Sequence, residues 1–183
     1  MVGIFTISFK AYDNFDEIKK MSAEEFDFTK QDIEGIIELN FNGNKYGMFF
    51  DDCPFGDERL IRWFIDLLTL AQKIKKYNYV AYRIPDRANW WFEFIGQENK
   101  VCVSLVEDIE RDLILDLFIY EPHKEFRYSS WKESLIDIDI FVKETLINAQ
   151  KFLSFVSVLN PQLLKSENIK MVQNLIYELK HSL

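Results

Sequence analysis

The sequence of 183 residues has few of the residue types that carry most enzyme chemistry: 2 His, 2 Cys and 6 Gly. Histidine is the commonest proton-transfer group in active sites, and glycine-rich loops form the usual phosphate cradles. The sequence contains no G-x-S-x-G segment, no Walker-type phosphate loop and no G-x-G-x-x-G fingerprint. It therefore predicts neither nucleotide-dependent chemistry nor a nucleophile activated by histidine, and we expect no catalytic residues.

Cysteine and histidine are also too sparse to indicate a metal site or a secreted disulfide framework. Cys53 and Cys102 lie far apart, so we expect reduced thiols, with a disulfide between them as the alternative. His123 and His181 have no ligand spacing to either cysteine. The acidic cluster after residue 106 does not follow the calcium-loop pattern. We expect neither a metal nor a cofactor.

Basic residues are outnumbered: 30 Asp and Glu oppose 22 Lys and Arg, which gives a net charge of -8. A negative surface potential repels phosphate backbones and attracts cationic surfaces. Direct nucleic-acid binding is therefore disfavoured. Taken alone, the charge is best explained as keeping the protein soluble. A basic protein partner is the alternative.

Long apolar runs are absent as well. No stretch approaches the roughly 20 residues that a membrane-spanning helix needs, and no basic region precedes the apolar residues near the N-terminus. We expect a cytoplasmic protein without membrane contact.

What the sequence does contain is hydrophobic and aromatic material, 48% and 16% of its residues, which is enough for a well-filled core. Alternating apolar residues predict strands. Asn42, Gly43 and Asn44 tolerate positive φ and predict a tight hairpin. The predicted strands cover residues 2–10, 33–41, 45–50, 77–84, 90–95, 100–107 and 113–120.

Helical spacing predicts one central helix and two C-terminal ones. The central helix covers residues 57–76, with Asp57 as its N-cap. A long second helix starts at Ser130 and Glu133, which fit a capping box, and stops before Pro161. Residues 135–141 also alternate like a strand, so a strand there is the alternative to the favoured helix. The third helix runs from residue 166 to the end.

These elements predict an α+β fold. We expect an antiparallel meander sheet of six to seven strands, with the helices packed largely on one face. No linker or repeat divides the chain, so residues 1–183 are predicted to form a single domain. Its first part, 1–127, holds mainly strands, and 128–183 is helical.

Candidate contact residues come from acidic and aromatic side chains. Trp90 and Trp91 are neighbours in a predicted strand and must face opposite sides. Either a helix or loop of this protein covers the second face of the strand, or Trp91 is partly exposed there and anchors a partner. Carboxylates outside the core favour contact with Lys or Arg of a partner. The candidates are Asp51, Asp52, Asp57, Glu58, Trp91, Glu93, Glu107, Asp108 and Glu110.

The layout resembles the immunity proteins of bacterial toxin systems, including those of contact-dependent inhibition. The resemblance rests on the hairpin at 42–44, the helix that carries Trp63 and Phe64, the aromatic segment 90–94 and the late aromatic stretch 131–155. It spans most of the chain. It implies a small, acidic, cytosolic inhibitor that plugs or flanks the active site of a toxin, often a basic nuclease, without catalysis of its own.

The expected function is therefore a non-catalytic protein that binds and neutralises a cognate, basic toxin domain. Two alternatives stay open. The first is a small enzyme that uses paired carboxylates, which a ligand-sized pocket around perturbed Asp or Glu residues would favour. The second is a homodimeric scaffold, which an uncovered apolar strip would favour.

Overall fold

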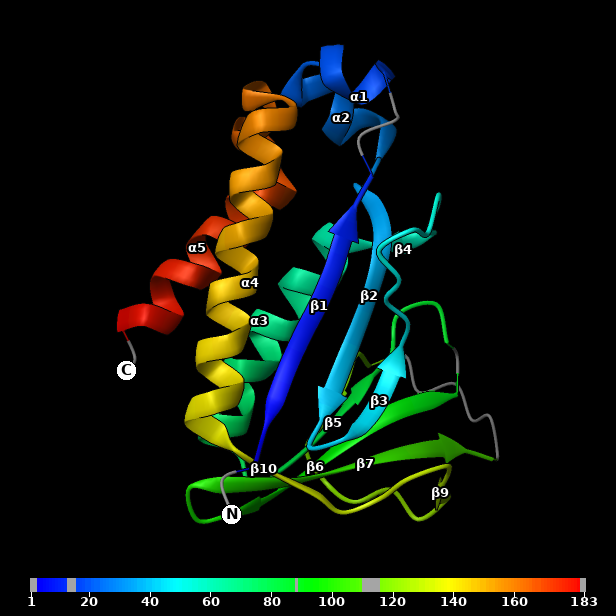
Figure 1. Cartoon of the computed structure of the whole chain (residues 1–183). Coiled ribbons are helices and arrows are strands. Elements are labelled where there is room, and N and C mark those ends of the chain that lie inside the picture. The colour runs from blue at the N-terminus through cyan, green and yellow to red at the C-terminus, as the bar shows by residue number, and fades with distance from the viewer. Residues whose placement is uncertain (1–2, 13–15, 88, 110–115, 182–183) are drawn as a thin grey trace. The chain divides into compact units, whose positions relative to one another are not determined.

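A computed structural model of the protein describes residues 3–12, 16–87, 89–109 and 116–181. Its helices and antiparallel strands confirm the predicted α+β class (Figure 1). The chain divides into two compact units. Unit 1 comprises Met1–Thr6, Asn40–Lys45 and Leu70–Val142, and unit 2 comprises Ile7–Leu39, Tyr46–Thr69 and Lys143–Leu183.

Unit 1 holds a six-stranded sheet in the order β10-β7-β6-β5-β8, with β9 also paired to β7. All its strand pairs are antiparallel, as predicted for the meander. The strands are β5 (Tyr79–Arg83), β6 (Trp90–Gln97), β7 (Lys100–Asp108), β8 (Phe118–Ile119), β9 (Phe126–Tyr128) and β10 (Ser134–Asp137). The predicted strand 113–120 lies partly outside the described residues, and β8 is its described part.

One face of this sheet carries the core of unit 1. Phe92 and Phe94 of β6 point to the same side because strand side chains alternate. Phe41 packs on both, at ring-centroid distances of 5.1 and 6.3 Å, and Trp131 lies 5.5 Å from Phe41. Phe141 completes the cluster 5.9 Å from Phe94. Burial of these rings is a main source of the unit's stability.

The N-terminal strands form a separate second sheet, whereas the sequence predicted a single sheet of six to seven strands. The order of the second sheet is β1-β2-β3, and β4 also pairs with β2. Asn42 and Gly43 have φ of 52° and 96°, so the predicted hairpin turn is confirmed. The strands are β1 (Phe5–Ala11), β2 (Glu34–Phe41), β3 (Asn44–Gly47) and β4 (Glu58–Arg59).

Unit 2 contains most of the helical residues. Phe9 of β1 packs on Phe64 and Phe152, at 5.0 and 6.2 Å, and these two rings stack at 4.9 Å. Asn160 donates from Nδ2 to the carbonyl oxygens of Ile18 and Met21, both at 2.8 Å. The helices of the protein are α1 (Asp16–Lys20), α2 (Ala23–Thr29), α3 (Leu60–Lys76), α4 (Ile138–Leu159), the 3-10 turn η1 (Pro161–Lys165) and α5 (Glu167–His181).

The prediction that Asp57 caps the central helix is wrong. Glu58 and Arg59 pair with Gly35 and Glu34 as β4, so α3 begins only at Leu60. Asp32 caps it instead, because its carboxylate accepts from the backbone N–H groups of Ile61 and Arg62 at 2.8 and 3.2 Å. The cap comes from a residue distant in sequence, which local patterns do not reveal.

The long helix also begins later than predicted. Glu133 has φ of 59°, which is incompatible with a capping box, and Ser134–Asp137 pair with β7 as strand β10. The strand alternative therefore holds for 135–137, and α4 starts at Ile138. Asp137 caps it, with Oδ1 accepting from the Asp139 N–H at 3.2 Å. The segment 128–183 is accordingly helical only from residue 138.

Candidate protein-binding site

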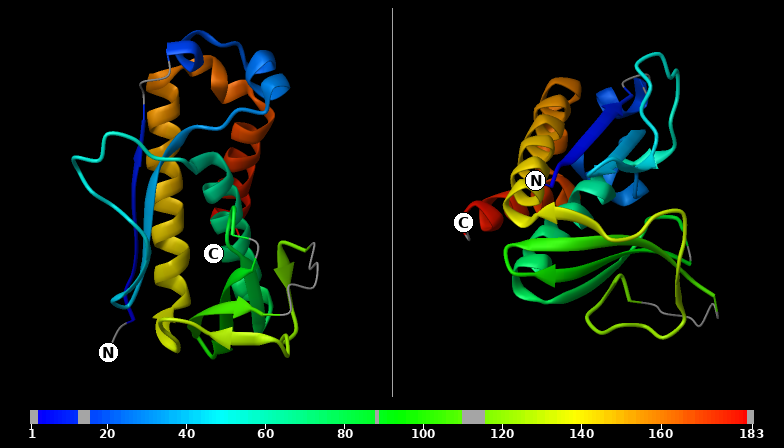
Figure 2. Two further views of the ribbon diagram at one scale, coloured as in Figure 1. Left: turned by 90° about the vertical axis from the view of Figure 1, so that its right-hand side faces the viewer. Right: turned by 60° about the horizontal axis from the view of Figure 1, so that its bottom comes forward.

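The most exposed of the predicted acidic segments lies between β3 and β4 in unit 2, and we call residues 48–57 the acidic loop. Figure 2 shows this segment projecting outward after β3 and returning at β4. Asp51, Asp52 and Asp57 are all exposed. They share the loop with the exposed side chains of Met48 (55%), Phe50 (61%) and Phe55 (75%). Three large apolar side chains so exposed within eight residues are typical of an interaction surface.

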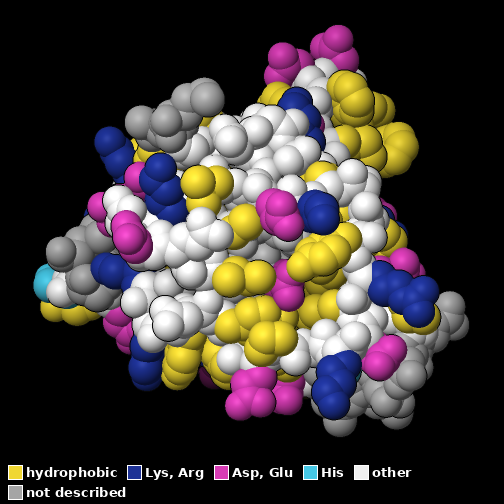
Figure 3. Space-filling view, turned by 90° about the horizontal axis from the view of Figure 1, so that it is seen from below, with side chains coloured by type: hydrophobic (Ala, Val, Ile, Leu, Met, Phe, Trp, Pro, Cys, Tyr) yellow, Lys and Arg dark blue, Asp and Glu magenta, His cyan; other side chains and the backbone are white. Residues whose placement is uncertain are grey.

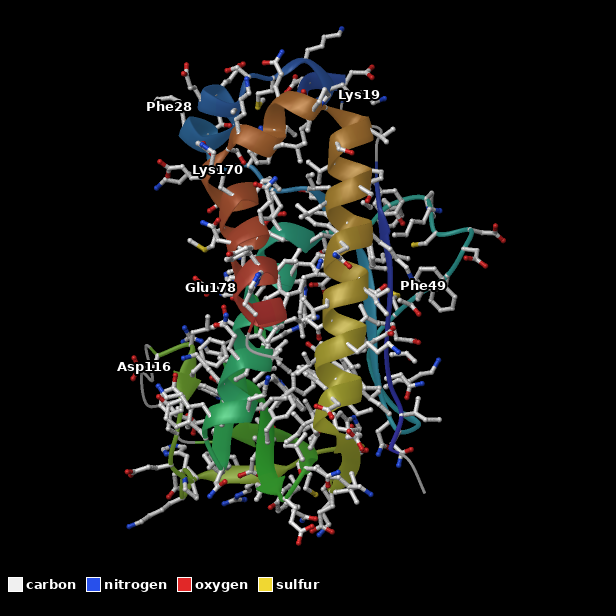
Figure 4. All side chains as sticks on the ribbon, turned by 90° about the vertical axis from the view of Figure 1, so that its left-hand side faces the viewer. Lys19, Phe28, Phe49, Asp116, Lys170 and Glu178 are labelled. Atoms are coloured by element: carbon white, nitrogen blue, oxygen red, sulfur yellow. The ribbon has the colours of Figure 1, made fainter. Side chains whose placement is uncertain are left out.

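Phe49 is less exposed than Phe50 and Phe55, the other two aromatic residues of the loop. It is half-buried and lies on the side of β1 that faces away from α4 (Figure 4). Phe49 is therefore partly covered, whereas Met48 and Phe50 are exposed to solvent.

Hydrogen bonds from two side chains to backbone oxygens hold the acidic loop against β1. Lys10 of β1 donates from Nζ to the carbonyl oxygen of Asp51 at 2.7 Å and to that of Cys53 at 3.4 Å. The Tyr12 hydroxyl also donates to the Cys53 carbonyl, at 2.8 Å. At Gly56 a Cβ would lie 2.3 Å from the Gly35 oxygen, so the loop approaches β2 too closely for a side chain. These contacts tie the middle of the loop to Lys10 and Tyr12 and its end to β2.

Glu58 has a structural contact that the sequence did not reveal. Its Oε2 accepts a hydrogen bond from Trp63 Nε1 at 2.7 Å, and its side chain is half-buried. A carboxylate already holding an indole N–H is less available to a partner than the three aspartates of the acidic loop.

The remaining candidates belong to unit 1, and most of them are buried. Trp91 is 1% exposed and packs with Tyr79, Ala81 and Val106, while Phe126 lies 5.6 Å away. Of the two alternatives for Trp91, the structure shows the one in which other segments of the chain cover the ring. The ring is therefore not exposed to a partner. Glu93 and Asp108 are also buried, and Glu107 is half-buried. Glu110 lies outside the described residues.

His123 and Asp108 are the one histidine–carboxylate pair that the structure records in its described part. Nε2 of His123 lies 3.6 Å from Oδ1 of Asp108, which is beyond hydrogen-bond distance for this pair. Both cysteines are free, with Cys53 half-buried and Cys102 buried. Among the described residues, His, Cys, Asp and Glu form no group of three or more that could hold a metal ion.

The carboxyl with the largest recorded perturbation is that of Asp32, whose pKa rises to about 6. Burial is the main cause, opposed by the N–H groups of Ile61, Arg62 and Ile33 and by the charge of Arg59. Because those N–H groups begin α3, the cap explains why a carboxyl is buried there. A perturbed carboxyl with such a structural role does not mark a reaction site by itself.

The sequence analysis did not identify Met48, Phe50 and Phe55 as candidate contacts. It placed Met48 and Phe50 in a predicted strand and assigned no role to Phe55. A signal was present: these residues flank acidic residues, a proline and a glycine, in a segment unsuited to a core. Nothing in the sequence near Lys10 or Tyr12 indicates that their side chains bind the backbone of the acidic loop.

Comparison of the chain with protein-family models, with curated proteins and with solved structures found no match. Within the described residues, no helix combines the length and apolar character that crossing a membrane requires.

Proposed function

We propose that this protein is a non-catalytic, protein-binding protein that neutralises a cognate toxin domain in the cytoplasm. Its contact surface would include the acidic loop, and its partner would carry a basic surface around an apolar pocket. The single observation that carries the proposal is the pairing of exposed Phe50 and Phe55 with the carboxylates of Asp51, Asp52 and Asp57 on an anchored loop.

This arrangement matches the usual anatomy of a strong protein contact. Aromatic side chains that enter a pocket on the partner supply most of the binding energy, and surrounding charges supply specificity and speed of association. The hydrogen bonds of Lys10 and Tyr12 to the loop backbone would lower the entropy lost on binding, because they restrict the loop before a partner arrives. The net charge of -8 attracts a basic partner over a longer range.

The toxin-neutralising part of the proposal comes from the resemblance in layout to immunity proteins. A stoichiometric inhibitor needs a contact surface and no reaction chemistry of its own. The acidic loop suits that requirement, since carboxylates accept charge-assisted hydrogen bonds from the Lys and Arg residues of a basic enzyme.

The test begins with capture of partners from the native cells by three tagged forms of the protein. They are the wild type, the double variant D51K/D52K, and a control, D116K/E121K. Asp116, labelled in Figure 4, and Glu121 are exposed residues of unit 1, and their reversal changes the net charge equally. We expect wild type and control to retain one basic protein at an equimolar ratio, and the loop variant to lose it.

Titration of the purified partner then measures the loop's contribution. Reversal of both aspartates should weaken binding by about tenfold or more, and should flatten its dependence on salt between about 0.05 and 0.3 M. Equal affinity and an equal salt slope in D51K/D52K would remove the acidic loop from the interface. No retained partner for the wild type would overturn the protein-binding proposal.

A growth assay tests neutralisation separately. Expression of the captured partner's domain should arrest growth, and co-expression of the wild-type protein should restore it. A partner that binds but is harmless would leave a binding protein and overturn the immunity reading.

A further inference from the structure

The second face of the six-stranded sheet in unit 1 carries polar groups where a core face would be apolar. Strand register places Glu93 beside Ala81 of β5 and Ser104 of β7, and Trp91 beside Val106. Tyr128 of β9 pairs with Val106, so it belongs to the same face. Figure 3 shows a side of the molecule on which hydrophobic side chains gather with acidic ones among them.

Glu93 is the unusual residue of this face. Its side chain is 7% exposed, and its Oε1 accepts a hydrogen bond from the Tyr79 hydroxyl at 2.9 Å. Its Oε2 is buried and receives no hydrogen bond from the described part of the chain. A buried carboxylate oxygen without a donor is costly, and native proteins rarely keep one without a reason.

The acidic groups around Glu93 influence one another. Glu93 raises the pKa of the Tyr128 phenol, with burial and Glu133 adding to the effect. The pKa of Cys102 is raised by burial and by the charges of Glu133 and Glu93. Burial and Glu93 likewise raise the pKa of Tyr79. The charges of Glu93 and Glu133 therefore both act on this face, and Oε2 of Glu93, which has no partner among the described residues, is the atom that a cation would satisfy.

The chain's own cations already contact the aromatic and acidic groups of this face. Lys132 Nζ lies 5.2 Å from the centre of the Tyr128 ring and 3.8 Å from Glu133 Oε1. Arg83 lies with Cζ 5.9 Å from the centre of the Trp91 ring. An ammonium and a guanidinium thus contact the rings that border Glu93.

We propose that Glu93 anchors a binding site for an arginine side chain of a protein partner. The guanidinium would donate to Oε2 of Glu93 and lie against the Tyr128 ring, with its methylenes on Ile95. Oε2 itself is buried and the Tyr128 side chain lies beside Glu93, so the guanidinium would enter by displacing that phenol; Tyr128 is 52% exposed and Ile95 39%. The site lies in unit 1 and does not depend on the acidic loop.

Arginine is the favoured occupant rather than lysine. Its guanidinium is planar and less strongly hydrated than an ammonium, so it enters a partly buried site at lower cost. It also stacks on an aromatic ring while it donates to a carboxylate.

The probe that tests the site is N-acetyl-arginine amide, titrated into the isotope-labelled protein to about 50 mM, a range suited to Kd values near 1 to 10 mM. We expect saturable shifts of the backbone amide signals of Tyr79, Glu93, Ser104 and Tyr128. N-acetyl-citrulline amide has nearly the same shape without the charge, and it should cause no saturable shift. Absence of saturation with the arginine probe, or equal binding of citrulline, overturns the proposal.

Variants assign the binding to Glu93. E93Q keeps an acceptor for the Tyr79 hydroxyl and removes the charge, so it should bind the probe about tenfold or more weakly. The matched control E121Q should bind like the wild type. Should E93Q fail to fold, Y128L changes an exposed residue and should weaken binding about threefold. Unchanged binding in the folded variants contradicts the assignment.

Two further results distinguish an arginine site at Glu93 from a lysine site and from binding at the acidic loop. Tighter binding of N-acetyl-lysine amide than of the arginine probe overturns the guanidinium assignment. Shifts confined to residues 48–57 that disappear in D51K/D52K assign the cation to the acidic loop and overturn the site at Glu93. The proposed function and this site can therefore fail independently.

Discussion

At the scale of single residues, Asp32 combines a structural role with a cost. Its two carboxylate oxygens accept from the backbone N–H groups of Ile33, Ile61 and Arg62, at 2.6 to 3.2 Å. These bonds and the helix N-terminus favour the charged form. Burial opposes it and prevails, since the pKa rises from 3.8 to about 6. The carboxyl therefore holds its proton longer in the folded chain than in the unfolded one.

This shift predicts a pH dependence of stability. A group whose pKa is raised on folding favours the folded state below its unfolded pKa, and the contribution is lost as pH rises through its folded pKa. The free energy of unfolding of the wild type, minus that of D32N, should therefore fall between about pH 4 and pH 7, by at most about 3 kcal/mol. Urea unfolding followed by tryptophan fluorescence at several pH values measures the difference.

D32N is a suitable reference because asparagine keeps one acceptor oxygen and cannot ionise. D32N loses the acceptor for the Arg62 N–H, which lowers the free energy of unfolding by the same amount at every pH. Only the change of the free-energy difference with pH therefore tests the pKa of Asp32. A difference that rises with pH would mean that the N–H groups outweigh burial and that the pKa is lowered.

At the scale of elements, the hairpin between β2 and β3 depends on its turn. Gly43 has φ of 96°, a conformation that side chains disfavour, although a Cβ there would meet nothing within 4 Å. The strain of a substitution would therefore come from the backbone alone.

G43A should destabilise the protein by about 1 kcal/mol, and G43N by less, because asparagine tolerates positive φ better than alanine. The shift of the urea midpoint at constant slope measures both. Equal stability of G43A and the wild type would show that the turn in solution has another conformation.

Local patterns were sufficient for most elements. Alternation identified the strands around Phe92 and Val103, and turn chemistry identified Asn42 and Gly43. The failures were at element starts, where a remote residue decides. Asp32 caps α3 from nearly thirty residues away, and Leu135 and Ile136 join β7 as a strand before α4 begins.

The candidate site was predictable to a smaller extent. The acidic loop was found through Asp51, Asp52 and Asp57, which are indeed exposed. Trp91 was also proposed as an exposed contact and is buried, because Phe126 of β9 and Ile119 of β8 pack against its cluster; Glu93 is buried too, so its contact with a partner stays a proposal. Burial of a strand residue depends on which later segment packs over it, and alternation alone does not identify that segment.

At the scale of the whole molecule, the two units share secondary structure. The unit boundaries fall inside β1, β2, β3, α3 and α4. Because helical hydrogen bonds are cooperative, melting one end of α3 or α4 weakens the other end. We therefore keep the prediction that residues 1–183 unfold as one domain.

The variant W63F tests this prediction. Its remaining tryptophans, Trp90, Trp91 and Trp131, belong to unit 1, whereas circular dichroism reports mainly the helices of unit 2. We expect the two signals to change with the same urea midpoint and slope. Separate midpoints would show that the units are independent domains.

The anchoring of the acidic loop has a consequence for how this protein can evolve. Lys10 and Tyr12 donate to main-chain oxygens, which every amino acid possesses. Mutations that replace the side chains of Phe50, Asp51, Asp52 or Phe55 leave these anchors in place. If the loop binds a partner as proposed, a few substitutions there would change what it binds, while the contacts that hold the loop against β1 would stay the same.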